Sequence, residues 1–271
     1  MLSLNAESCE LFNIPFYQFA QMKKFCPEDI PAIKADYKLH WDNWKAIIQE
    51  VAKQLGMPFA KPHIESWTNG WQVRAHFFAY FKYEFNQNSA AIFSVLLNRR
   101  RLRVCLDWHC YRADRSQINV QQYNQWLDQF DFKEFADFDI WREDESEYDD
   151  FRQVKAISEK DLLLRSDEDF WCIGKSIEKA ELHQIDPVSF ITQTIQQLQP
   201  LYDRCHQKSA VISIKFFRLV YLLCYPYISL TFLTILLLGV LYEKRRDRWR
   251  GRRRHRVSDI FRRQIRSQKT S

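Results

Sequence analysis

The sequence predicts an α+β fold, in which an antiparallel sheet packs against amphipathic helices. Residues 71–112 alternate polar and apolar side chains in the manner of three consecutive strands. Residues 33–55 place apolar side chains at intervals of three and four, as one face of a helix requires. The chain is 46% hydrophobic and 15% aromatic, which favours a densely packed body over disorder. We expect this body to span residues 1–208.

The polar side chains of residues 71–112 fall into two rows, because side chains alternate between the two faces of a strand. The first row holds Gln72, Arg74, His76, Phe78, Tyr80 and Lys82. The second row holds Arg103, Cys105, Asp107, His109 and Tyr111. If both rows lie on one face of the sheet, the candidate ligand-binding residues that converge there are Arg74, His76, Arg103, Asp107 and His109.

Asp107 and His109 are two residues apart, so a carboxylate and an imidazole on one strand face could contact the same ligand. Adding His76 would give a metal site with two histidines and one aspartate. A half-buried Asp–His pair that satisfies itself is the commoner outcome of this spacing. We therefore expect a structural network in place of a metal site and assign no catalytic residue.

The run NRRRLR, residues 98–103, makes the turn into the third predicted strand. Guanidinium groups can bind a phosphate or a carboxylate through two parallel hydrogen bonds. Charged side chains also keep a hairpin tip solvated. We favour the solvated tip for Arg99 and Arg100, whereas ligand binding competes better at Arg103, which shares its row with Asp107 and His109.

The helix over residues 33–55 should end at Gly56, because glycine readily caps a helix C-terminus. Before the first strand, Asn69 and Gly70 predict a turn. A short helix is expected over residues 119–130, and the acidic segment 137–150 that follows is expected to be a solvated loop.

A further strand is expected over residues 170–173. The Gly-Lys-Ser that follows resembles the end of a phosphate-binding loop, but Asp169 stands where that motif requires its first glycine. Asp186 and Pro187 should open the last helix of the body as N-cap and first residue, and Pro200 should disturb its end.

Several enzyme and metal-site motifs are missing from the sequence. It contains no G-x-G-x-x-G, G-x-S-x-G or H-E-x-x-H, and His63 and Glu65 form an H-x-E without the P-C-x-x-C of zinc deaminases. Its seven cysteines include no C-x-x-C pair, so we expect buried free thiols and a reducing compartment for the body.

The C-terminal quarter differs in character from the body. Residues 219–242 form a charge-free run of 24 residues, about 36 Å as a helix, which predicts a transmembrane segment. Residues 243–271 form an Arg-rich tail with a net charge of +10, whereas the whole chain carries +6. The tail should contact anionic lipid headgroups, although nucleic-acid phosphates would attract it too.

The charges give conflicting signals for the orientation in the membrane. The basic tail favours the cytoplasm, which would place residues 1–215 on the other side of a single span. The first 25 residues lack the pattern of a signal peptide, and the free cysteines favour a cytoplasmic body. A re-entrant segment turning near Pro226, a translocated tail, or a C-terminal region of separate origin would each resolve the conflict. We predict an inner-membrane protein with a cytoplasmic body and leave the side of the tail open.

The stretches Trp67–Glu84, LNRRRLRVCLDWH and FADFDIWREDESEY resemble a small bacterial domain family found in Haemophilus and lactic-acid bacteria. The resemblance covers residues up to about Cys205. Some members of that family are labelled bacterial glucose-6-phosphate 1-dehydrogenase, which implies a dinucleotide and a sugar phosphate. The glycine fingerprint of dinucleotide-binding folds is absent from this sequence, so no catalytic residue is carried over.

Three functional hypotheses follow. The first is a membrane-anchored protein whose body binds a small molecule or a protein partner through the Arg and His face of its sheet. The second is an oxidoreductase that acts on a sugar phosphate, as the family label implies. The third is a nucleic-acid-binding protein that uses its arginines. The sequence leaves open whether the protein is an enzyme and which cofactor it would use.

Overall fold

The structure is a computed structural model that describes residues 2–128, 130–143, 146 and 148–207, all within one compact unit. Its helices are α1 (Ala6–Glu10), α2 (Phe19–Phe25), α3 (Ile30–Leu55), α4 (Val120–Tyr123) and α5 (Pro187–Cys205). Its strands are β1 (His63–Ile64), β2 (His76–Phe81), β3 (Ala91–Asn98), β4 (Arg101–Trp108), β5 (Asp139–Arg142), β6 (Arg152–Gln153) and β7 (Trp171–Glu178). Short 3-10 helices are Pro27–Asp29, Glu84–Asn86, Cys110–Arg115, Asn124–Leu127, Val154–Ala156, Glu159–Leu162 and Leu182–Gln184.

The predicted α+β class is confirmed, because the strands form one antiparallel sheet in the order β1-β2-β3-β4-β7-β5-β6. The predicted run of three consecutive strands corresponds to β2, β3 and β4. The first of them begins at His76 rather than near Trp71, since Gln72 and Val73 form only isolated bridges. Gly70, at the predicted turn before them, has a φ of +96°, which favours glycine.

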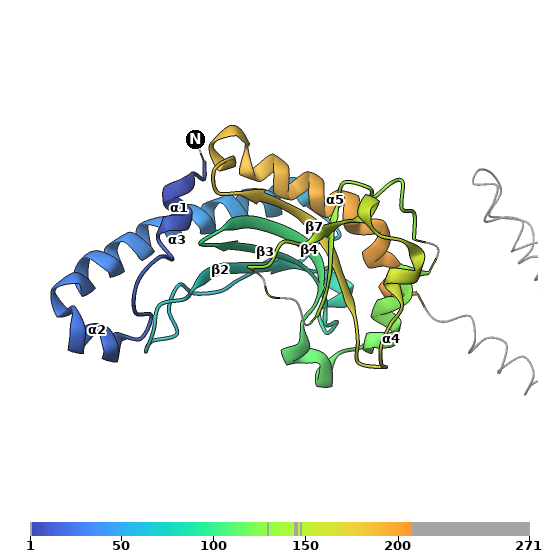
Figure 1. The fold of residues 1–271 in the computed structure, drawn as a ribbon, viewed down its shortest axis with the longest axis horizontal. Coiled ribbons are helices and arrows are strands. Elements are labelled where there is room, and N and C mark those ends of the chain that lie inside the picture. Colours follow the sequence, from blue (N-terminus) through green and yellow to red (C-terminus); the bar gives the residue numbers. More distant parts are fainter. Residues whose placement is uncertain (1, 129, 144–145, 147, 208–271) are drawn as a thin grey trace, which may run out of the picture. The chain divides into compact units, whose positions relative to one another are not determined.

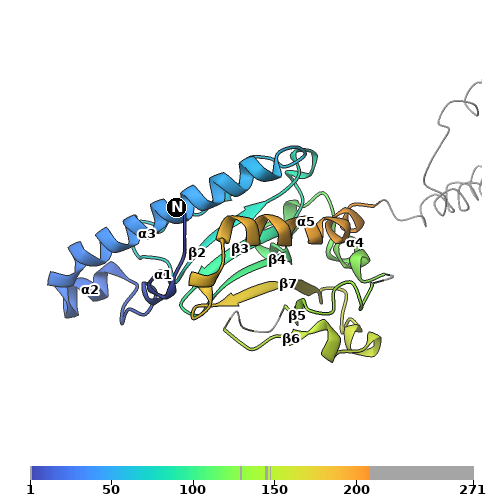
Figure 2. The ribbon, with the colours of Figure 1, turned by 90° about the horizontal axis from the view of Figure 1, so that it is seen from above.

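The pairing register assigns each side chain of the central strands to one of two faces. Phe78 of β2 lies opposite Leu96 of β3, which lies opposite Arg103 of β4, so these three share a face. Figure 1 and Figure 2 show both long helices, α3 and α5, on one side of the sheet. We call that side the covered face. We call the opposite side, which carries Phe78, Leu96 and Arg103, the open face.

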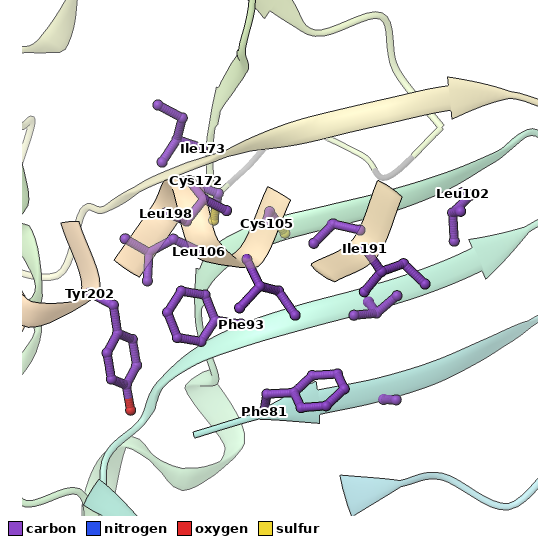
Figure 3. Packing of buried hydrophobic residues seen from close by; sticks show 14 of the residues in the cluster. Phe81, Phe93, Leu102, Cys105, Leu106, Cys172, Ile173, Ile191, Leu198 and Tyr202 are labelled. Atoms are coloured by element: carbon purple, nitrogen blue, oxygen red, sulfur yellow. The ribbon is translucent and has the colours of Figure 1, made fainter. Parts of the chain in front are cut away.

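The covered face holds the core. Phe93 of β3 stacks on Tyr202 of α5 with ring centroids 4.5 Å apart, and Trp44 of α3 lies 6.3 Å from Phe77. Figure 3 shows Ile191 and Leu198 of α5 beside the same strands. These side chains are almost entirely buried, and burial of each contributes about 1.5–3 kcal/mol. The apolar row of the alternation therefore holds the two long helices in place.

The long helix is confirmed, since α3 runs to Leu55 and Gly56 follows it with a φ of +57°. The predicted helix over residues 119–130 is shorter, because α4 passes into a 3-10 helix at Asn124 that ends at Leu127. Pro200, which was expected to disturb the end of the last helix, lies inside it. Helix α5 continues to Cys205, because Leu201 and Tyr202 extend its buried stripe and offset the backbone hydrogen bond that proline cannot make.

The predicted strand at residues 170–173 is longer than expected, because β7 includes Gly174, Lys175 and Ser176. A Cβ atom at position 174 would lie 2.1 Å from the carbonyl oxygen of Val104. Gly174 therefore allows β7 to approach β4 closely, and the Gly-Lys-Ser sequence is part of the sheet rather than of a phosphate-binding loop.

None of the helices in the described part of the chain is long and apolar enough to cross a membrane. The predicted transmembrane segment, residues 219–242, and the predicted basic tail, residues 243–271, lie outside the described residues. Both remain predictions.

Candidate functional site

The open face carries the predicted polar rows on neighbouring strands. By register, His76 of β2 shares this face with Arg103 and Asp107 of β4. The parts of the two rows that lie within β2 and β4 therefore share one face, which the alternation alone left open. Their members do not all meet, because β2 and β4 run in the same direction within the sheet. His76 of β2 lies level with Arg101 of β4. Asp107 of β4 lies level with Lys82 of β2, so His76 and Asp107 are about six residues, or roughly 20 Å, apart along the strands.

Arg103 is the most deeply placed cation of the five predicted residues. Its side chain is only 8% exposed, and its guanidinium carbon lies 4.8 Å from the ring centroid of Trp141 and 5.5 Å from that of Phe151. The described chain provides it with no ion pair, and its Nε is buried without a hydrogen-bond partner. Two aromatic rings thus hold a buried guanidinium that forms no ion pair within the described residues, although Arg103 is close enough to Asp139, on the same face, to lower the pKa of that carboxyl against the rise that burial causes.

The neighbouring arginines of the hairpin turn are paired with the chain's own acidic groups. Arg100 forms ion pairs with Asp150 and with Glu178, and Arg101 places its Nε 3.1 Å from the Glu178 carboxylate. The guanidinium of Arg99 lies over the ring of Tyr148 at 4.5 Å. Part of the acidic segment therefore contacts the turn, which the sequence did not indicate.

Asp107 is hydrogen-bonded within the sheet. One carboxylate oxygen accepts a hydrogen bond from Ser94 at 3.1 Å, and the other accepts one from the Cys172 thiol at 3.3 Å. Burial raises the pKa of Cys172 well above its ordinary value, so this thiol stays protonated and acts as a donor. Burial likewise raises the pKa of Cys105, which contacts Ser94, to about 12. Asp107 therefore belongs to a hydrogen-bonded network, but its donors in the described chain are Ser94 and Cys172 and not the neighbouring His109 considered from the sequence.

His109 follows β4 and lies in a group of aromatic rings. Its ring centroid is 5.6 Å from that of Tyr80 and 6.1 Å from that of Tyr111. Burial, and next the positive charge of Arg112, lower the pKa of His109, while Asp107 opposes the shift. The imidazole is therefore neutral at pH 7.

Arg74 and His76 lie apart from this group. Arg74 precedes β2 and forms an ion pair with Glu65 at 2.8 Å. His76 begins β2, at the end of the sheet away from Asp107 and His109. The His76, Asp107 and His109 metal cluster considered from the sequence is therefore not assembled, and no other metal-binding group of His, Cys, Asp or Glu occurs within the described residues.

The structure adds three residues to the open face. His63 of β1 stacks on Tyr80 with centroids 4.8 Å apart, and the Lys82 nitrogen lies 5.3 Å from the Tyr80 centroid. Burial, followed by Arg112, lowers the pKa of Lys82 to about 8. Tyr80 and Lys82 belong to the predicted row and could have been selected from it. His63 could not, because β1 has only two residues and shows no alternation.

The surface also has cavities outside the open face. One of about 570 Å³ lies beside α4, and its charged lining residues Asp128, Arg165 and Asp167 are of mixed sign. Another of about 270 Å³ is lined by acidic groups, including Glu7 and Glu10 of α1. Neither includes any of the five predicted site residues, and neither contains an unpaired buried cation, so the open face is the stronger candidate.

Comparison with known proteins identifies relatives of the body. A protein-family model matches residues 4–205. Over 207 residues, which are 76% of this chain and the whole of the relative, the chain is 94% identical to an uncharacterized protein of Haemophilus influenzae. About a quarter of this chain therefore has no counterpart in that relative. The resemblance to a family with a member in Haemophilus is confirmed, and the chain belongs to that family.

Proposed function

We propose that the protein binds an anionic small molecule on the open face of its sheet and that Arg103 pairs with the negative charge. The observation that supports this most directly is the 8% exposure of Arg103 without an ion pair in the described chain. A buried unpaired charge costs stability, because the protein interior replaces the water that solvated it. An anionic ligand would supply the missing partner.

The chemistry around Arg103 supports an anion rather than a cation. The guanidinium presents a planar fork of donors that matches a carboxylate or a phosphate. Lys82 is 4% exposed and donates to the backbone carbonyls of Gln87 and Ser89, and no carboxylate of the described chain pairs with it. Asp107, on the same face, already accepts two hydrogen bonds. Arg103 and Lys82 share this face with the carboxylates Asp107 and Asp139, but within the described residues they form no ion pair with either.

A thermal-shift titration of the full-length protein in detergent tests the proposal, with inorganic phosphate and glucose 6-phosphate as probes. The wild type should gain about 2.7 kcal/mol of stability when a probe reaches one hundred times its dissociation constant. Arg103→Met keeps an unbranched apolar stem but removes the guanidinium, and it should abolish the gain. Arg101→Met is the matched control, because Arg101 lies on the same strand and face but pairs with Glu178, and its gain should remain. Equal gains for wild type and Arg103→Met would refute the proposal.

The oxidoreductase and nucleic-acid hypotheses predict different results in the same preparation. Reduction of a nicotinamide dinucleotide that requires glucose 6-phosphate would establish the enzyme. Binding of a single-stranded oligonucleotide that weakens steeply with salt, without any response to phosphate, would favour nucleic acid. An anion-binding protein should show saturable probe binding and neither of these behaviours.

We also propose that residues 219–242 anchor the protein in the inner membrane, with the body in the cytoplasm and the basic tail against anionic lipid. The support is the charge-free run of 24 residues and the positive charges that follow it. Carbonate extraction of membranes should leave the full-length protein in the pellet and release a variant that ends at residue 208. Release of both would contradict the anchor.

A further inference from the structure

Building on the proposed anion site, we infer that its ligand also carries a planar ring, joined to the negative charge through a spacer, as in a nucleoside phosphate. The open face places aromatic rings beside cations, Lys82 and Arg103, that form no ion pair within the described residues. Rings stack on planar ligands, and guanidinium and ammonium groups pair with phosphate.

The rings form a continuous series across three strands. His63 of β1 stacks on Tyr80 of β2 at 4.8 Å, Tyr80 lies 5.6 Å from His109, and Phe78 lies 6.5 Å from His109. The series continues to Tyr111, which is 94% exposed. Tyr80 is 7% exposed and forms the floor, while Phe78 and His109 are only partly buried. Partly buried rings around a buried one leave aromatic surface for a planar group.

Positive charge lies next to these rings. Lys82 lies over the ring of Tyr80, and Arg112 is close enough to lower the pKa of both Lys82 and His109. A ring that approaches this series would therefore meet an electropositive border. An electron-rich, negatively charged compound suits such a surface better than a neutral or cationic one.

The separation between Arg103 and Phe78 decides the form of the ligand. They lie level with each other on strands β4 and β2, with β3 between, so their backbones are roughly 10 Å apart. The Arg103 side chain contacts Trp141 and Phe151 on the side of β4 away from β2, so its charge lies no nearer to Phe78 than this. Leu96 of β3 lies between them and is apolar, although its neighbours already cover most of it. A charge attached directly to a ring cannot span this distance. A ring and a phosphate joined through a sugar can.

Calorimetric titration of the full-length protein with three probes tests the inference. Adenosine 5′-monophosphate combines ring, spacer and phosphate, glucose 6-phosphate lacks the ring, and phenyl phosphate lacks the spacer. We expect adenosine 5′-monophosphate to bind at least about tenfold more tightly than either of the others. Phe78→Leu should lower this ratio about tenfold. Phe85→Leu is the matched control, because Phe85 is exposed and its ring contacts Tyr83, away from the ring series, and it should leave the ratio unchanged.

The possible outcomes separate the inference from the function on which it rests. Equal affinity for all three probes, lost in Arg103→Met, would overturn the ring and leave the anion site intact. No binding of any probe would overturn both. Tight binding of a single-stranded oligonucleotide with no binding of the mononucleotide would also overturn the inference and identify a nucleic-acid surface.

Discussion

Arg142 and Arg103 lie on opposite faces of the sheet and are buried to the same extent, each with 8% of its surface exposed. Each guanidinium also lies over a tryptophan ring, Arg142 at 4.3 Å from Trp171 and Arg103 at 4.8 Å from Trp141. Of the two, only Arg142 forms an ion pair within the described residues. It forms an ion pair with Asp169, which is itself buried, and donates to backbone carbonyls in the segment after β6.

This difference separates a cation that supports the fold from one that is available to a ligand. The charge of Arg142 is neutralised by the chain, so its removal would leave Asp169 buried and unpaired. The charge of Arg103 has no such partner among the described residues, so its removal leaves no unpaired carboxylate there. Burial and aromatic stacking alone therefore do not identify a functional arginine. What distinguishes Arg103 from Arg142, and supports the proposed role of Arg103, is that it forms no ion pair within the described residues.

The largest expected effect is on the covered side. Arg142→Met should lower the free energy of unfolding by about 3–5 kcal/mol, because Asp169 loses its partner in a buried site. Urea unfolding monitored by tryptophan fluorescence measures this. The double variant with Asp169→Asn should recover part of the loss, and a single variant as stable as the wild type would remove the distinction between the two arginines.

A substitution at the close approach between β7 and β4 tests how far the open face depends on the spacing of these strands. Gly174→Ala should cost about 1–3 kcal/mol, because the new Cβ would overlap the Val104 carbonyl oxygen and push β7 away from β4. Since Arg103 lies on β4 and Trp141 on β5, beyond β7, the shift should also weaken anion binding. Urea unfolding and phosphate titration of the same variant test both effects. Unchanged stability would show that the close approach is not required.

A smaller effect is expected from His206, which joins the end of α5 to the β2–β3 connection. Its Nδ1 lies 2.8 Å from the Tyr202 carbonyl, and its Nε2 lies 2.8 Å from the Ser89 hydroxyl. Burial lowers the pKa of His206, so the unfolded chain binds the proton more readily. The stabilisation is complete above about pH 6.5 and decreases as the pH falls through the lowered folded pKa. His206→Gln should flatten the dependence of the unfolding free energy on pH between pH 7 and 5. If that slope is unchanged in the variant, other groups cause the pH dependence.

The sequence was sufficient for the parts of the fold that depend on local patterns. The alternation in residues 71–112 correctly placed Arg103 and Asp107 on one face, and Gly56 correctly marked the end of α3. It could not show that His76 and Asp107 lie at opposite ends of that face, because this follows from the directions of β2 and β4 in the folded sheet.

The pairing state of the arginines could not be read from the sequence either. Glu178 and Asp150, which neutralise the hairpin turn, lie 78 and 50 residues from Arg100. Trp141 and Phe151, which enclose Arg103, come from the same distant segment as Asp150. Contacts between residues so far apart depend on the order of strands in the sheet, which local patterns do not specify.

We infer that Arg103 is held for a ligand and not for the fold. The most direct test is to measure the unfolding free energies of Arg103→Met and Arg142→Met side by side, in buffer without phosphate or other multivalent anions. We predict that Arg103→Met is within about 1 kcal/mol of the wild type or more stable, because methionine retains the packing and removes an unpaired buried charge. A loss of about 3–5 kcal/mol, equal to that of Arg142→Met, would contradict the claim and make Arg103 a structural residue.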